Sequence, residues 1–213
     1  MKLFFHYCPF GFSNCYVLGA EKPADEGGKT GDPMALLVDP GVMDKVILNF
    51  IENNNYTLGG VLITHDHRNH VHGLRTLRRI YNTEIYAINH IILDYRTTMV
   101  RDGDVFDIGP FSLEVISVPG HSSDSAVFKV ERFLFTGDAL SAGLVGSTAS
   151  SYGAAVQTTA LRSRIFSLPG DYIVLPGHGP PSSLEAERCF NAGIEQYEQH
   201  KNRRPQFAPE FFE

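Results

Sequence analysis

The sequence predicts a mixed α/β domain that contains two β-sheets, and three observations support this fold class. The chain has 213 residues, of which 43% are hydrophobic and 20% charged, as in a globular protein with a large core. Up to about residue 100, short apolar runs alternate with stretches of helical periodicity, which is the pattern of βαβ units. From residue 101 onward, strand-like runs follow one another with tight turns, which is typical of an antiparallel sheet.

The first half of the chain is predicted to contain four strands and two helices. Its strands are short apolar runs bounded by Gly, Pro or Asn, whereas in its helices apolar residues recur every three or four positions. In chain order these elements are the strands 17–19 and 35–38, the helix 42–51, the strand 60–64, the helix 71–81 and the strand 84–88. The polar residues 21–33 between the first two strands are expected to form a flexible loop.

The second half is predicted, by the same criteria, to contain five strands and two helices. In chain order they are the strands 105–108, 111–118, 125–130 and 133–135, the helix 157–168, the strand 172–175 and the helix 184–199. The length fits one unit, so residues 1–213 are expected to form a single domain. Residues 203–213 are expected to form a C-terminal tail that can contact a partner.

The charge and the cysteines exclude several classes of protein. The chain carries 18 basic and 24 acidic residues and lacks a run of Lys or Arg, so we expect no nucleic-acid partner. Cys8, Cys15 and Cys189 form no C-x-x-C motif and cannot all pair within one chain, which favours free thiols in a reducing compartment. No apolar stretch fits a signal peptide or a membrane span. We therefore expect a cytoplasmic protein with a small-molecule substrate and no membrane partner, and a homo-oligomer is left open.

Polar side chains follow four of the predicted strands at the point where each strand ends. They are His65, His67 and His70 after the strand 60–64, His121 after 111–118, Asp138 after 133–135, and His178 after 172–175. The ends of neighbouring strands lie at one rim of a sheet, so these side chains are expected to converge. Imidazoles and a carboxylate are good ligands for zinc or iron, and a carboxylate can bridge two cations. A Gly precedes three of these positions and permits the sharp turn that each strand end needs.

The motifs around these residues resemble those of the metallo-β-lactamase superfamily, and in particular its small glyoxalase-II-like hydrolases. The matching segments are His-x-His-x-x-His at 65–70, Pro-Gly-His-Ser at 119–122, Thr-Gly-Asp at 136–138 and Pro-Gly-His-Gly-Pro at 176–180. The resemblance covers nearly the whole chain and implies a four-layer αββα sandwich with two mixed sheets and outer helices. It also implies one or two divalent metal ions, zinc before iron or manganese.

The ligand roles are likewise implied by the resemblance. His65, His67 and His121 would surround a first metal, His70 and His178 a second, and Asp138 would lie between the two. The chain departs from the family at Asn69, where the family carries an Asp that helps to hold the second metal and orients or deprotonates the attacking water. An Asn can neither accept a proton nor contribute negative charge. We therefore expect a firmly bound first ion and a weakened second site.

The resulting hypothesis is a metal-dependent hydrolase of a small ester or thioester, with Asn69 and Asp138 as the catalytic positions. A bound metal makes water more acidic and polarises the carbonyl that the water attacks. Two alternatives are a one-iron enzyme that resembles the persulfide dioxygenases of the same superfamily, and a metal-binding member without turnover. The first would need only the first set of ligands.

Several other polar residues are weighed against structural roles. His6, His90 and His200 are expected to be ordinary surface or hydrogen-bonded residues, and His72 to cap or pack against a helix. Asp39 could hydrogen-bond a ligand His or merely begin the Asp-Pro-Gly turn. Asp66 could likewise support a His or be solvated. Cys8 and Cys15 are expected to pack in the core.

Overall fold

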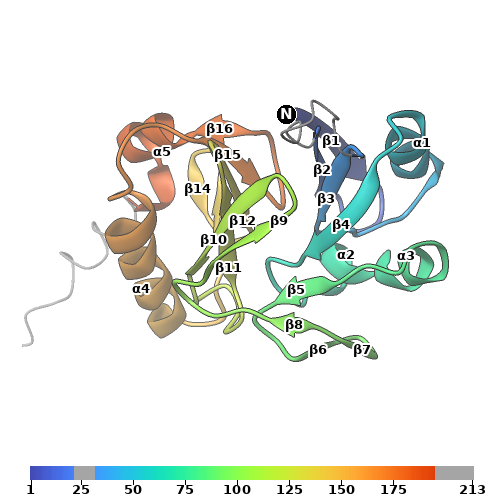
Figure 1. The fold of residues 1–213 in the computed structure, drawn as a ribbon. Coiled ribbons are helices and arrows are strands. Elements are labelled where there is room, and N and C mark those ends of the chain that lie inside the picture. Colours follow the sequence, from blue (N-terminus) through green and yellow to red (C-terminus); the bar gives the residue numbers. More distant parts are fainter. Residues whose placement is uncertain (22–31, 195–213) are drawn as a thin grey trace, which may run out of the picture.

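The computed structural model describes residues 1–21 and 32–194, which form two six-stranded sheets packed face to face with helices on both outer sides (Figure 1). The layers run helix, sheet, sheet, helix, which confirms the expected αββα sandwich. Several sequence expectations lie outside the described residues: most of the loop 21–33, the tail 203–213, His200 and the end of the helix 184–199.

The first sheet combines antiparallel and parallel strands. Its order is β1 (Lys2–Cys8), β2 (Ser13–Ala20), β3 (Met34–Val38), β4 (Thr57–Leu62), β5 (Ile85–Ala87) and β8 (Thr98–Met99). Strands β1 to β3 pair antiparallel, and β3, β4, β5 and β8 pair parallel. The sequence does not predict β1, whose Phe5 and Tyr7 stay exposed because β1 is the edge strand of the sheet.

The second sheet is also mixed. Its order is β16 (Ser182–Ser183), β15 (Ile173–Pro176), β12 (Phe133–Gly137), β11 (Ala126–Val130), β10 (Phe111–Ser117) and β9 (Val105–Ile108). Strands β9 to β12 form the predicted antiparallel series, and β15 joins it parallel to β12. Two short hairpins complete the strands: β6 (Ile91–Ile92) with β7 (Tyr95–Arg96), and β13 (Leu140–Ser141) with β14 (Leu144–Val145).

The helices begin and end at different residues from those predicted. They are α1 (Lys45–Asn53), α2 (Arg68–Val71), α3 (Leu74–Ile80), α4 (Ser151–Ala160), the π-helix η1 (Leu161–Ile165) and α5 (Leu184–Phe190). The helix predicted at 71–81 is divided at Gly73, which packs so closely on Pro40 that a Cβ would lie 2.4 Å from the Pro40 carbonyl oxygen. Helix α4 begins earlier than predicted because the Ser150 hydroxyl accepts the Gly153 N–H and caps it.

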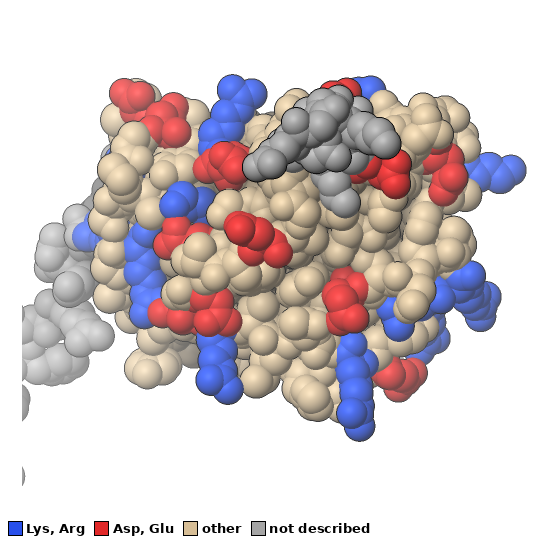
Figure 2. Space-filling view, viewed as in Figure 1, with Lys and Arg blue, Asp and Glu red and all other residues tan. Residues whose placement is uncertain are grey.

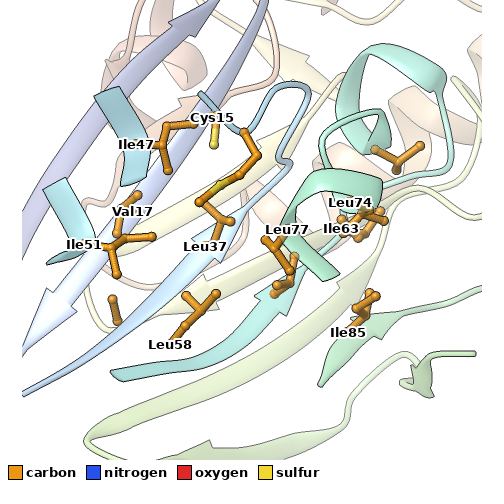
Figure 3. Packing of buried hydrophobic residues seen from close by; sticks show 14 of the residues in the cluster. Cys15, Val17, Leu37, Ile47, Ile51, Leu58, Ile63, Leu74, Leu77 and Ile85 are labelled. Atoms are coloured by element: carbon orange, nitrogen blue, oxygen red, sulfur yellow. The ribbon is translucent and has the colours of Figure 1, made fainter. Parts of the chain in front are cut away.

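Alternate residues of the central strands face opposite sides of the first sheet. Cys15 and Val17 of β2 and Leu37 of β3 point to the outer helices, where Ile47 and Ile51 of α1 pack on them (Figure 3). Each such fully buried aliphatic side chain contributes about 1.5–3 kcal/mol. The buried, free thiols of Cys8 and Cys15 agree with the expected packing role.

The same alternation of side chains produces the other two hydrophobic cores, one between the sheets and one outside the second sheet. Leu18 and Leu36 point inward from the first sheet and meet Phe111 and Phe128 of the second. On the other side of the second sheet, Leu134, together with other outward side chains, packs under α4, η1 and α5. The three cores account for the four layers.

Two backbone hydrogen bonds join the sheets at one edge. The Asn14 N–H at the start of β2 donates to the Gly177 carbonyl after β15 at 2.7 Å, and the Ala126 N–H of β11 donates to the Thr64 carbonyl after β4 at 2.9 Å. These bonds hold the loop after β4 close to the loops that follow the strands of the second sheet. All the predicted site residues lie in these connections.

The surface carries charges of both signs. On the face shown in Figure 2, Lys and Arg are interspersed with Asp and Glu, and the described residues of that face gather no continuous basic patch. Within the described part of the chain, no helix has the length and apolar character that crossing a bilayer requires.

Candidate metal centre

The six predicted ligands lie together at the edge where the sheets are joined. His65 follows β4, while His121, Asp138 and His178 follow β10, β12 and β15. The expected single rim of one sheet is therefore a rim shared by both, because β4 belongs to the first sheet and the other three strands to the second. His67 precedes α2 and His70 lies within it, so the short helix turns both back toward the strand ends.

The first cluster contains His65, His67, His121 and Asp138, whose ligand atoms lie within 4.8 Å of one another. His67 Nδ1 lies 3.0 Å from both His65 Nε2 and His121 Nε2. Asp138 Oδ2 lies 3.8 Å from His65 Nε2 and 3.6 Å from His121 Nε2. Four ligands held tetrahedrally by a zinc ion are about 3.3 Å apart, so these spacings suit a cation of that size.

The hydrogen bonds on the far side of two rings fix which nitrogen faces the cluster as a lone pair. The Thr64 hydroxyl donates to Asp39, so it accepts from His65 Nδ1 at 3.1 Å and leaves Nε2 unprotonated in the neutral ring. His121 Nδ1 donates to the Ser147 carbonyl at 2.8 Å, with the same result for its Nε2. Lone pairs that converge in this way are what a metal ion requires.

The second cluster contains His70, His178 and the same Asp138. Asp138 Oδ1 lies 3.4 Å from His70 Nε2, and its Oδ2 lies 3.5 Å from His178 Nε2. His70 Nε2 and Asp138 Oδ1 are buried and have no hydrogen-bond partner among the described residues. Buried polar atoms without a partner are costly, and a cation between them would satisfy both. The donor set therefore fits metal ions on both sides of Asp138.

Asn69 occupies one corner of this second cluster. His178 Nδ1 donates to the Phe12 carbonyl at 3.0 Å, so its Nε2 is an acceptor, and the Asn69 amide N–H donates to it at 2.9 Å. The tip of the β1–β2 hairpin lies directly on Asn69, since a Cβ on Gly11 would lie 2.4 Å from the Asn69 Cβ. The lone pair of His178 is thus already engaged by a neighbouring side chain.

The pKa values follow from burial and from the two carboxylates. Burial, assisted by the charge on His70, lowers the pKa of His65 to about 3. Burial also opposes a charge on His70, but the close Asp138 carboxylate and the hydrogen bond to Asp39 outweigh it and raise the pKa of His70 to about 10. Burial opposes ionisation of Asp138 too, yet the close His70 cation and the other nearby rings lower its pKa to about 2. Without a metal ion, His70 is therefore a cation held between two carboxylates.

Comparison with known proteins identifies the family of the chain. The sequence profile of the metallo-β-lactamase superfamily matches residues 8–178. The chain belongs to this superfamily. The match begins at the end of β1 and ends at His178, so it includes every predicted ligand.

Individual relatives cover the chain to different extents. An uncharacterized protein of Mycobacterium tuberculosis is 30% identical over 85% of this chain and 92% of its own length. A hydroxyacylglutathione hydrolase of Francisella tularensis is 33% identical over 68% of this chain, which spans 58% of that protein. The solved structure of ETHE1 from Myxococcus xanthus has a TM-score of 0.76 at 25% identity and covers 97% of this chain and 93% of its own.

Asp39 contacts the predicted ligand His70 directly, so the first of the two roles weighed for it is present together with the turn. Its Oδ2 accepts the Thr64 hydroxyl at 2.6 Å and contacts His70 Nδ1 at 3.0 Å, and its Oδ1 accepts the Thr64 N–H. The residue holds a backbone φ of +48°, a strained conformation for a non-glycine residue. Because both oxygens are engaged, the buried group of Asp39, His65 and His70 offers no free carboxylate to a further ion.

Two glycines bring the strand ends close enough to form the centre. Gly137 has a φ of +50° and packs on Thr64, where a Cβ would lie 2.3 Å from the Thr64 hydroxyl. A Cβ on Gly177 would lie 2.3 Å from Asp138 Oδ1 and 2.5 Å from His70 Cε1. A side chain at either position would push the ligands apart.

The residues expected to have structural roles lie outside the clusters. His6 pairs with Asp44 at 3.0 Å, His90 is exposed, and His72 stacks on Phe10 with ring centroids 4.5 Å apart. The Asp66 backbone N–H donates to Asp124, and no hydrogen bond joins the Asp66 carboxylate to a histidine in the described part of the chain.

Four supporting residues are not found by sequence reasoning. Thr64 and the carbonyl groups of Phe12 and Ser147 orient the rings, while the Asn14 amide donates to the Pro176 and Gly179 carbonyls on either side of His178. Backbone carbonyls carry no sequence signal, and Asn14 lies more than 160 positions from its partners.

Proposed function

We propose that the protein is a metal-dependent hydrolase that acts on a small ester or thioester. The observation that supports it most is the convergence of the ligand atoms of His65, His67, His121 and Asp138, at separations that suit one divalent cation. The 33% identity to a hydroxyacylglutathione hydrolase supports the reaction class. Because the chain spans 58% of that relative, its substrate is not carried over.

In this proposal the first ion is held by His65, His67, His121 and Asp138, and a second by His70, His178 and Asp138. When bound, a divalent cation increases the acidity of water and polarises a carbonyl group. Asp138 supplies the negative charge shared by both halves, and its low pKa keeps it ionised. Ligand type alone does not choose among zinc, iron and manganese.

Asn69 makes the second cluster a weaker candidate metal site than the first. Its amide donates to His178, so an ion bound there has to replace that hydrogen bond and receives no negative charge from position 69. Asn69 cannot take a proton from water, and its contribution to the reaction is to hold His178 in place. We therefore propose a second ion that binds more weakly than the first.

The proposal is tested by metal analysis and turnover together. Plasma mass spectrometry of the purified protein should find about one tightly held transition-metal ion per chain, with a second bound only in excess metal. A chelator should abolish hydrolysis of p-nitrophenyl acetate and of a simple acyl thioester, and one equivalent of metal should restore it. Fully metallated protein that hydrolyses neither compound would contradict the proposal.

A second candidate is a one-iron enzyme similar to the persulfide dioxygenases. The engagement of His178 by Asn69 favours it, because only the first cluster is then free to bind an ion. The structural similarity to ETHE1 is compatible with this candidate. Iron in the purified protein, with oxygen uptake on addition of glutathione persulfide and no ester hydrolysis, would select it. Metallated protein that is inactive in both assays would leave a binding role without turnover.

A further inference from the structure

A small cavity opens beside the metal centre, between the ligands and the β13–β14 hairpin. Its volume is about 200 Å³, and its walls include His121 and Asp138 on one side and Leu144 and Val145 on the other. This is smaller than the 300–1,000 Å³ typical of pockets for drug-sized ligands. A group that binds here therefore has to be compact.

Apart from the metal ligands, the walls of the cavity offer no cationic side chain to an anionic substrate group. Besides the ligands, the cavity is lined by small or apolar residues, including Ser141 and Ser147, and none of the lining residues is Lys or Arg. Apart from the metal ligands, the lining thus offers contacts that suit an uncharged group.

Leu144 supplies the apolar surface of this cavity. Its side chain is 53% exposed although it is apolar, and it lies at the first position of β14. Val145 beside it packs on the core under the outer helices, so the backbone that carries Leu144 is fixed. An exposed apolar side chain on a fixed backbone next to the reacting centre can contact the hydrocarbon part of a substrate.

The hairpin is held rigid by a buried carboxylate of α5. Glu187 is 2% exposed, and both of its oxygens accept the Gly143 N–H at the hairpin tip, at 3.0 and 3.1 Å. Ser182 and Asn191 donate to the same carboxylate at 2.6 Å each, and the Ala192 N–H donates to the Gly143 carbonyl. Four donated hydrogen bonds satisfy this buried charge and fix the tip to the helix.

The other end of the hairpin segment is fixed to the metal centre itself. The Gln157 amide of α4 donates to the carbonyls of Ala139 and Gly146, on either side of the hairpin. The next carbonyl, of Ser147, accepts from His121 Nδ1. The hairpin that carries Leu144 therefore lies at a fixed distance from the ligands. A wall that cannot move discriminates between substrate groups of different size.

From this geometry we infer that the β13–β14 hairpin is the acyl-binding wall, and that the enzyme selects short, uncharged aliphatic acyl groups. The inference rests on the proposed hydrolase function. Leu144 contacts the acyl chain, and Glu187 is a positioning residue that acts through Gly143.

The experiment compares p-nitrophenyl acetate, butyrate and octanoate with Leu144→Ala, Glu187→Gln and, as a matched control, Ile80→Ala, which removes an exposed apolar side chain of α3. The wild type should prefer acetate or butyrate. Leu144→Ala should raise the octanoate to acetate ratio of kcat/KM at least about tenfold, because a few methylenes in a pocket are worth that much. Ile80→Ala should leave the ratio unchanged.

Glu187→Gln separates positioning from mere stability. In the variant, the amide NH2 of Gln replaces one carboxylate oxygen and faces the hydrogen-bond donors of Gly143, Ser182 or Asn191. The hydrogen bonds that this oxygen accepted are lost, which releases the hairpin tip. The expected result is a raised KM with a flattened preference for acyl length at unchanged metal content. Equal loss of activity for all three esters would assign Glu187 a structural role only and overturn that part of the inference.

A binding measurement keeps this inference distinct from the proposed function. The probes are 2-hexanone, an uncharged ketone that cannot be hydrolysed, and S-hexylglutathione, which has the same chain length and two carboxylates. Methyl resonances of Leu144 and Val145 should shift with 2-hexanone and much less with S-hexylglutathione. Shifts with the ketone but no ester turnover would overturn the hydrolase alone, whereas stronger shifts with the glutathione derivative, or none with either, would overturn the inference.

Discussion

The two halves of the metal centre share Asp138 but differ in how completely the chain has built them. In the first half, the His65 side chain is 1% exposed and that of His121 10%, and each carries an oxygen acceptor on its second ring nitrogen. In the second half, His70 and His178 also have an oxygen acceptor on Nδ1, but the His178 side chain is 37% exposed and its Nε2 lone pair accepts from Asn69. The first half is therefore complete without position 69, and the second is not.

If the two proposed sites share Asp138 as a bridging ligand, one residue can separate them. With Asn69 in the chain all six candidate ligands lie together, but its amide carries no charge and presents a donor where the second ion would bind. Affinity, rather than geometry, then distinguishes the halves.

The largest expected effect is the contrast between His121→Ala and His178→Ala. Removing His121 takes a lone pair from the complete half, and hydrolysis should fall by on the order of a thousandfold, beyond the 10–100-fold usual for lost outer partners. Removing His178 should cost less than about tenfold. Metal content and kcat/KM of both variants test this, with the exposed His90→Ala as the control. Equal losses would end the distinction between the halves.

The metal-free protein should lose stability at alkaline pH through the second half. The pKa of His70 is raised from 6.5 to about 10, so its contribution is fully present below pH 6.5 and is lost as the pH rises to 10. The loss should be on the order of a few kcal/mol. Urea unfolding of chelator-treated protein between pH 6.5 and 10 measures it. His70→Gln should lack this slope, and a slope that persists in the variant would assign it to other groups.

Asp39→Asn should weaken metal binding by about 10–100-fold, because Asp39 orients His70 directly and His65 through Thr64. Competition with a chromophoric chelator measures the affinity. Asp44→Asn is the matched control, since Asp44 caps α1 and Asn caps a helix about as well, so the change should cost less than about 1 kcal/mol of stability. Comparable loss of affinity in both variants would show that Asp39 acts through general stability.

The smallest effect is expected for Asn69→Asp, which should tighten the second site roughly tenfold by restoring one negative charge. Calorimetric titration of protein already loaded with one ion measures this affinity directly. The exposed Asn82→Asp controls for the added charge alone. If Asn69→Asp binds no more second ion than the control, the hydrogen bond to His178 is not what weakens the site.

The convergence of the candidate ligands could be predicted where a strand ends in a polar residue, because an apolar run that ends in Gly-His or Gly-Asp is visible locally. His121, Asp138 and His178 are such cases. The four-layer arrangement was available only through the resemblance, since the residue pattern indicates two sheets without showing how they pack.

The features of the site and fold that the sequence does not predict are mainly those that depend on long-range contacts. The Asp-Pro-Gly turn accounts for Asp39 by itself, and its bond to His70 spans 31 positions. The bond from Asn69 to His178 spans 109 positions, so the sequence predicts a weak second site but not that His178 is already engaged. The edge strand β1 is missed because two of its five apolar side chains, Phe5 and Tyr7, remain exposed to water.

The two backbone bonds between the sheets, Asn14 to Gly177 and Ala126 to Thr64, both lie beside the metal centre. Thermal separation of the layers should then begin away from this edge, where only side chains interlock. Hydrogen exchange would accordingly be slowest at these amides, and the protein could lose its distant packing on heating while it still retained a bound ion.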